Sequence, residues 1–172
     1  AEDGIRDVAV TGVQTCALPI LVIADDSANP TVIATEMIAQ AEHDPLASVV
    51  LVTWAPAVAS RVIAELERLV PLTPRARIVR ESFAAKGGVV TFDSRAEAIA
   101  FASAYAAEHA LIATRDALEI TAELRNAGTV FVGETASVAF GDYLSGANHV
   151  LPTGGMARSY SGLSTLDFYR WT

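Results

Sequence analysis

LVIADDSANPTVIA, residues 21–34, contains one complete transition from a strand to a helix. Its four leading apolar residues end at Asp25 and Asp26, as a buried parallel strand does when it leaves a sheet. Asn29 followed by Pro30 is typical of a helix N-cap with proline at the first helical position. The apolar residues that follow recur at helical spacing. This stretch therefore predicts a strand–loop–helix unit of an α/β fold.

The same alternation of apolar strand and amphipathic helix continues along the chain. The predicted strands are Leu21–Ala24, Val49–Thr53, Val89–Phe92, His109–Ala113 and Thr129–Val132. Two predicted helices begin at Pro30 and Pro56, and Pro71 stops the second. Four more predicted helices cover residues 75–86, 94–105, 116–125 and 137–144. Ser94 and Glu97 form a capping box at the start of the helix over 94–105. Such an order implies right-handed crossovers and a doubly wound, mostly parallel sheet with helices on both faces. We expect an incomplete Rossmann-like domain, because no G-x-G-x-x-G or G-x-x-x-x-G-K-[ST] sequence follows a strand.

Composition narrows the class of protein. With 172 residues, 52% of them hydrophobic and 19% charged, the chain is long and apolar enough for one packed domain or a piece of a larger protein. Its net charge is −8, from 12 Lys and Arg against 20 Asp and Glu, which argues against nucleic acid or an anionic membrane as a partner. No apolar run approaches the roughly 20 residues of a membrane helix. A single cysteine excludes an internal disulfide framework.

The first twenty residues do not share the periodic pattern. VTGVQTCALPI, residues 10–20, and AEDGIRD, residues 1–7, resemble two translated segments of a common sequencing-library adapter, in the right order and frame. We interpret residues 1–20 as a non-native segment rather than a natural N-terminal arm. Cys16 would then not be natural, and the natural part would carry a net charge of −6. Genomic sequence that runs through this region without adapter would contradict the interpretation.

Two pairs of polar residues contain histidine. Gln40 and His43 are spaced i and i+3 near the end of the first predicted helix, so both could reach one metal ion, although such pairs are also common on helix surfaces. Glu108 and His109 are adjacent where a helix meets a strand. Their ordinary pKa values bracket weakly acidic pH, so the two could divide proton transfers. Their place at the start of a strand is unfavourable, because open sheets usually bind ligands at the carboxyl ends of strands.

The third histidine lies in a segment without regular periodicity. Asp142 lies near the end of the last predicted helix, and the run Gly146-Ala147-Asn148-His149 predicts an irregular loop after it. Loops preferentially carry functional groups. All three histidines of the chain therefore lie beside other metal-ligand or proton-transfer residues.

Taken together, these segments resemble histidinol dehydrogenase, the zinc enzyme at the end of histidine biosynthesis. The matching segments, in family order, are LVIADDSANP, IAQAEHDPLAS, AYAAEH, NAGTVFVG, GDYLSGANHVLPTGG and SGLSTLDF. The resemblance implies that residues 21–146 form the domain on the zinc and substrate side of the enzyme. It also implies that residues 147–172 form a site loop and a tail.

The resemblance assigns roles to individual residues. It implies that Gln40, His43 and Asp142 bind zinc and also contact the substrate. Glu108 and His109 correspond to the catalytic bases of the family. His149 would contact the substrate, as would His109.

The resemblance further implies two cofactors, Zn²⁺ and NAD, and a cytoplasmic homodimer that oxidises L-histidinol through the aldehyde to L-histidine with two NAD. It identifies no NAD-binding residue in this chain. In the family, the main NAD-binding domain precedes this region, and a further zinc-binding histidine follows it, so we expect the 172-residue chain alone to be inactive. Two alternatives remain: a superfamily relative that oxidises another polar alcohol with NAD, and a non-catalytic metal-binding module.

Overall fold

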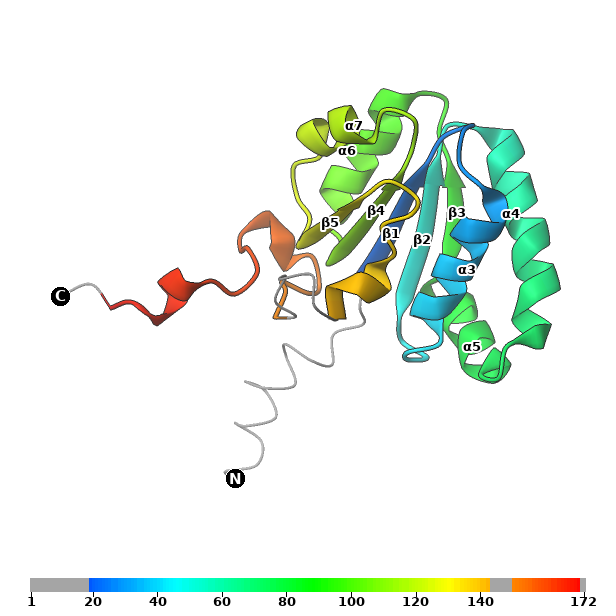
Figure 1. Cartoon of the computed structure of the whole chain (residues 1–172), viewed down its shortest axis with the longest axis horizontal. Coiled ribbons are helices and arrows are strands. Elements are labelled where there is room, and N and C mark those ends of the chain that lie inside the picture. The colour runs from blue at the N-terminus through cyan, green and yellow to red at the C-terminus, as the bar shows by residue number, and fades with distance from the viewer. Residues whose placement is uncertain (1–18, 143–149, 171–172) are drawn as a thin grey trace.

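A computed structural model describes residues 19–142 and 150–170 of the chain (Figure 1). Its strands form one sheet in the order β3-β2-β1-β4-β5, and every neighbouring pair is parallel. The strands are β1 (Pro19–Ala24), β2 (Ser48–Thr53), β3 (Gly88–Thr91), β4 (His109–Ala113) and β5 (Thr129–Val132). The predicted α/β class and parallel sheet are confirmed.

Helices cover both faces of the sheet, as predicted for a doubly wound fold. The α-helices are α3 (Pro30–Ala41), α4 (Pro56–Leu69), α5 (Ala76–Lys86), α6 (Arg95–Tyr105) and α7 (Ala117–Glu123), and the 3₁₀ helices are η2 (Val70–Leu72), η3 (Val138–Asp142), η4 (Met156–Arg158) and η5 (Thr165–Phe168). Apolar residues of α3, α4 and α5 pack on one face, and those of α6 and α7 pack on the other (Figure 1). Within the described ranges, no helix has the length and apolarity to cross a membrane.

The central strand β1 contributes to both halves of the core. Ile20 and Val22 belong to the cluster under α3, whereas Leu21 and Ile23 belong to the cluster under α6 and α7. All six residues of β1 are buried. A strand covered on both faces reads as a continuous apolar run, which is why the sequence pattern identified it.

Local signals place most helix ends correctly. The Asn29 side chain accepts a hydrogen bond from the Thr31 amide at 3.0 Å and caps α3. Helix α4 ends at Leu69, immediately before the 3₁₀ turn that contains Pro71. At α6 the Ser94 hydroxyl accepts from the Glu97 amide at 3.2 Å, which is one of the two bonds of the predicted capping box.

The first strand begins two residues earlier than predicted. Pro19 and Ile20 pair with Ser48 and Val49 of β2, and Ile20 is fully buried. Proline is tolerated at the first residue of a strand. The last two residues of the adapter-like segment therefore belong to the sheet, whereas residues 1–18 lie outside the described part of the chain.

The prediction of an α-helix over residues 137–144 is wrong, because this segment contains a 3₁₀ helix instead. The chain forms the 3₁₀ helix η3 over Val138–Asp142, and residues 143–149 lie outside the described ranges. The Val138 amide donates to the side chain of Glu36 on α3 at 3.0 Å. This tertiary bond satisfies the amide at the start of η3, and no local sequence pattern reports it.

Candidate active site at the amino edge of the sheet

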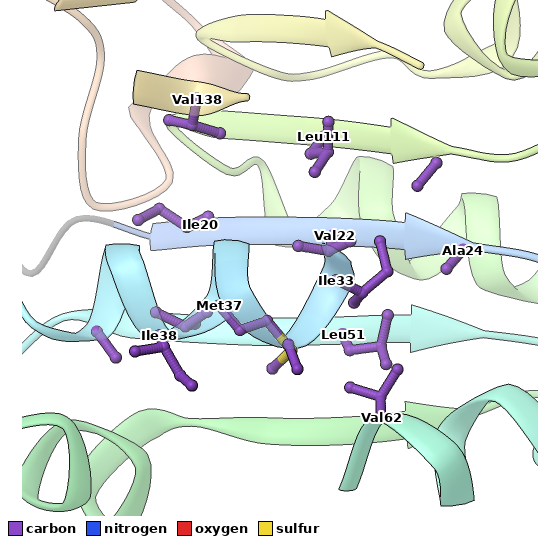
Figure 2. Close-up of a cluster of buried hydrophobic side chains, with 14 of the residues drawn as sticks. Ile20, Val22, Ala24, Ile33, Met37, Ile38, Leu51, Val62, Leu111 and Val138 are labelled. Carbon is purple, nitrogen blue, oxygen red and sulfur yellow. The ribbon is translucent and has the colours of Figure 1, made fainter. Parts of the chain in front are cut away.

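The end of α3 and the start of β4 lie at the same edge of the sheet. Helix α3 runs antiparallel to the strands, with Ile33 near the carboxyl end of β1 and Ile38 near its amino end (Figure 2). The end of the helix therefore carries Gln40 and His43 to the amino edge of the sheet, where β4 begins at His109. Gln40 is buried and His43 is exposed.

Glu108 and His109 are held by backbone bonds to the strands on either side. The Glu108 amide donates to the Pro19 carbonyl at 2.9 Å, and the Glu108 carbonyl accepts from the Thr129 amide at 2.8 Å. Both side chains are buried, and His109 Nδ1 lies 4.0 Å from Glu108 Oε1. The His109 ring also faces Phe131, with 5.9 Å between ring centroids. The sheet thus fixes two proton-transfer groups side by side.

A residue in the left-handed backbone conformation lies just before Glu108 and His109. Ala106, the C-cap of α6, has φ of +54°. This conformation costs a non-glycine residue roughly 1 kcal/mol, and tertiary structure must offset the cost. The bend leads from the end of α6 into β4 within three residues.

Burial changes the acidity of Glu108. Loss of solvent around the carboxyl raises its pKa from 4.5 to about 7. Glu108 Oε2 is fully buried and accepts no hydrogen bond within the described part of the chain. A carboxyl that titrates near neutral pH can act as either base or acid there.

The raised pKa of Glu108 predicts a pH-dependent stability. Between its usual pKa of 4.5 and about 7, the folded chain holds this proton while the unfolded chain has lost it. Stability from this group is therefore greatest below pH 4.5 and is lost as pH rises to about 7. We expect Glu108→Gln to become more stable relative to wild type by about 2 kcal/mol between pH 5 and pH 8. Urea unfolding at both pH values measures this difference. The exposed Glu67→Gln is the control, and an equal wild-type–variant difference at both pH values would contradict the assignment.

The residues at this edge fit a metal such as zinc in the type of atoms they offer. Gln40 Nε2 donates to Glu36 Oε1 at 3.2 Å, which leaves Gln40 Oε1 available as a ligand. His43 adds an exposed imidazole two residues after the end of α3. Mixed nitrogen and oxygen ligands suit a borderline ion. The described residues contain no group of three His, Cys, Asp or Glu side chains placed to hold a metal ion, and the side chain of Asp142 lies outside them.

Two later segments reach the same edge. Val138, which begins η3, packs in one cluster with Ile20 at the amino end of β1 (Figure 2). The buried stretch 151–153 follows the predicted substrate residue His149, which itself lies outside the described residues. The structure therefore places Gln40, Glu108, His109 and the backbone of η3 at the same edge of the sheet, and His43 is exposed two residues after the end of α3.

Gly128 permits the close approach of three of these segments. A Cβ at Gly128 would lie 2.7 Å from the Glu108 carbonyl oxygen and 3.2 Å from Pro152 Cδ. We expect Gly128→Ala to lower the free energy of unfolding by about 1–3 kcal/mol, because backbone must shift to accept the methyl group. Chemical denaturation measures the loss. Gly88→Ala is the matched control, since no described atom beyond its two chain neighbours lies within 4 Å of its Cβ position, and equal losses would contradict the prediction.

The lining of a cavity at the carboxyl edge of the sheet holds more carboxylates than cations. A cavity of about 370 Å³ there is lined by Asp25, Asp26, Trp54, Arg95, Arg115 and Asp116. Arg95 lies 2.8 Å from Glu123, and Arg115 lies 3.6 Å from Asp26, so both cations already face carboxylates. We assign no NAD contact to these residues.

Comparison with known proteins identifies the family. The family description "Histidinol dehydrogenase" matches residues 9–172. The chain belongs to the histidinol dehydrogenase family. The match begins inside the adapter-like segment and covers every candidate site residue.

Individual relatives agree with this assignment. Histidinol dehydrogenase of Leifsonia xyli is 50% identical over 155 residues, covering 88% of this chain and 35% of the relative. That of Thermobifida fusca is 44% identical over 164 residues, covering 94% of this chain and 37% of the relative. The crystal structure of histidinol dehydrogenase from Elizabethkingia anophelis superposes with a TM-score of 0.80 at 37% identity, over 85% of this chain and 34% of that one. The chain thus spans about a third of the length of these family members.

Sequence reasoning missed two residues that organise this edge. Glu36 precedes Gln40 by one helical turn, and only this spacing could have indicated that the two side chains touch. The sequence around Gly128 did not indicate that this glycine lies close to the backbone of Glu108. Both act through contacts between segments that are distant in the chain.

Proposed function

We propose that this chain is part of an enzyme that oxidises L-histidinol through the aldehyde to L-histidine, with two NAD as hydride acceptors. The observation that carries the proposal is the buried Glu108–His109 pair at the edge where α3 ends, in a chain of the histidinol dehydrogenase family. The alcohol and aldehyde steps each need a base beside the reacting carbon. The pair supplies two such groups.

Substrate binding would be the task of the end of α3 and the loop after η3. Gln40, His43 and Asp142 would hold Zn²⁺, and His149 would contact the substrate. When bound, the ion would supply a template for the imidazole and amine of histidinol. The Glu36 contact turns the amide oxygen of Gln40, rather than its nitrogen, toward this role.

Proton transfer would be divided between the two bases. His109 would take the hydroxyl proton of the alcohol, and later that of the aldehyde hydrate. Glu108 would take a proton from the water that adds to the aldehyde. A pKa of about 7 makes the carboxylate of Glu108 a stronger base than an exposed glutamate, and a large fraction of it is ionised at neutral pH.

The remaining assignments follow the family. We propose a cytoplasmic homodimer, with residues 21–146 forming the zinc and substrate side and 147–172 the site loop and tail. The NAD-contacting residues stay unassigned. The chain spans about a third of the length of its relatives, and we propose that the 172-residue chain alone does not reduce NAD with histidinol.

Chimeric enzymes test the function. Residues 21–172 would replace the matching third of the Leifsonia xyli and Thermobifida fusca relatives, and NAD reduction with L-histidinol would be measured. We expect activity within about tenfold of each parent, a loss of about 1.4 kcal/mol or less in transition-state stabilisation. Folded chimeras that do not reduce NAD would overturn the proposal in favour of a non-catalytic module. Faster turnover of another polar alcohol than of histidinol would overturn the substrate assignment.

A further inference from the structure

We propose that Glu36 is a positioning residue that aligns two predicted zinc ligands, Gln40 and Asp142. The inference rests on the proposed function and concerns a side chain that neither binds substrate nor transfers a proton in it. Glu36 lies on α3 and is only 7% exposed. Its carboxylate joins α3 to η3.

Three donors occupy the two oxygens of this carboxylate. Oε1 accepts from Gln40 Nε2 at 3.2 Å and from the Val138 amide at 3.0 Å. Oε2 accepts from the Ser137 hydroxyl at 2.7 Å. These bonds use three of the roughly four lone-pair sites of the carboxylate, so we assign Glu36 a role that acts through its neighbours.

The first consequence concerns Gln40. A glutamine amide offers a metal its oxygen, whereas its NH₂ group has no lone pair suited to the task. The bond from Nε2 to Glu36 selects the orientation in which Oε1 remains available. Without Glu36 the amide could rotate and present its nitrogen.

The second consequence concerns Asp142. Ser137 and Val138 begin the segment in which η3 ends at Asp142, and they are bound to a residue about a hundred positions earlier in the chain. One buried side chain therefore sets the distance between the end of α3 and the backbone of η3. A buried carboxylate is costly to desolvate, so its three bonds are needed to retain it. An apolar side chain of similar size would fill the space at lower cost but would leave the Val138 amide unpaired.

Metal binding by the chimera carrying residues 21–172 tests this role. We expect Glu36→Leu to weaken Zn²⁺ affinity, measured by chelator competition, by about 10–100-fold. It should also change the visible absorption spectrum of the Co²⁺-loaded protein. Glu36→Gln should recover most of the affinity, since its amide oxygen can accept from Gln40 and Val138 while its NH₂ donates to Ser137. Glu67→Leu removes an exposed carboxylate and is the matched control.

Ser137→Ala removes one of the three bonds of Glu36, together with the 3.3 Å bond that the Ala139 amide donates to Ser137 Oγ, and it decides the matter if Glu36→Leu does not fold. We expect a loss of several-fold in Zn²⁺ affinity. Unchanged affinity in Ser137→Ala, or a Glu36→Leu protein that binds Zn²⁺ like wild type with an unchanged Co²⁺ spectrum, would overturn the positioning role. An unsubstituted chimera that folds but binds no Zn²⁺ would instead overturn the proposed function.

Discussion

Replacing Glu108 with glutamine is expected to slow oxidation of the aldehyde by about 10²–10⁴-fold, while oxidation of the alcohol continues. Glutamine has nearly the same shape but accepts no proton at neutral pH. Glu108 is buried with a pKa of about 7, so wild type keeps much of this carboxyl available as a base near neutrality. Only the second oxidation needs an activated water, and this asymmetry separates the two steps.

Two substrates measure the steps separately. NAD reduction would be followed in the chimera with L-histidinol and with L-histidinal, and the aldehyde released from histidinol would be trapped and quantified. We expect the variant to form one NADH from each histidinol instead of two, with aldehyde as the product. The control is Glu67→Gln, which alters an exposed carboxylate on α4. Unchanged turnover of both substrates would refute the role of Glu108, and equal loss of both would refute the division of labour with His109.

Replacing Leu111 with alanine is expected to lower the free energy of unfolding by about 3 kcal/mol. Leu111 is completely buried, with an exposed fraction of 0%. It pairs with Val22 of β1 and Phe131 of β5 and belongs to the core cluster on the face of the sheet that α3 covers (Figure 2). Its removal leaves a cavity that three neighbouring elements cannot easily close.

Chemical denaturation of the 172-residue chain measures this loss. Leu118→Ala is the matched control, because Leu118 is 77% exposed on α7 and its truncation should change stability by less than about 0.5 kcal/mol. Because Leu111 lies two residues after His109 on the same face of β4, the variant should also loosen the start of that strand. A loss below about 1 kcal/mol for Leu111→Ala would contradict its place in the core.

Short-range signals account for the correctly predicted elements. The bounds of β4 and β5 agree with the prediction, and the Asn29 cap and the stop before Pro71 lie where their sequences indicate. The predictions fail where a contact between residues distant in the chain determines where an element begins or which type it adopts. Pro19 joins β1 through pairing with Ser48, and η3 begins with a bond to Glu36.

In the candidate site, too, local sequence signals account for some features and contacts between distant segments account for others. Spacing predicted that Gln40 and His43 share a helix face, but α3 ends at Ala41, Gln40 is buried and His43 is exposed. Adjacency predicted that Glu108 and His109 could act together, and their side chains lie 4.0 Å apart. The rule that ligands bind at carboxyl ends of strands argued against this pair, since β4 begins there. The antiparallel course of α3 brings its own end to that amino edge, and this placement supports the site proposed there.

The sequence by itself determined the element types, the parallel α/β class and the resemblance to histidinol dehydrogenase, because periodicity, caps and motifs are local properties of a chain. Only the tertiary structure decided the pKa of Glu108, the close fit at Gly128 and the bridge from Glu36 to η3. Desolvation and hydrogen bonding depend on which distant residues surround a group, and a linear spacing does not contain that information.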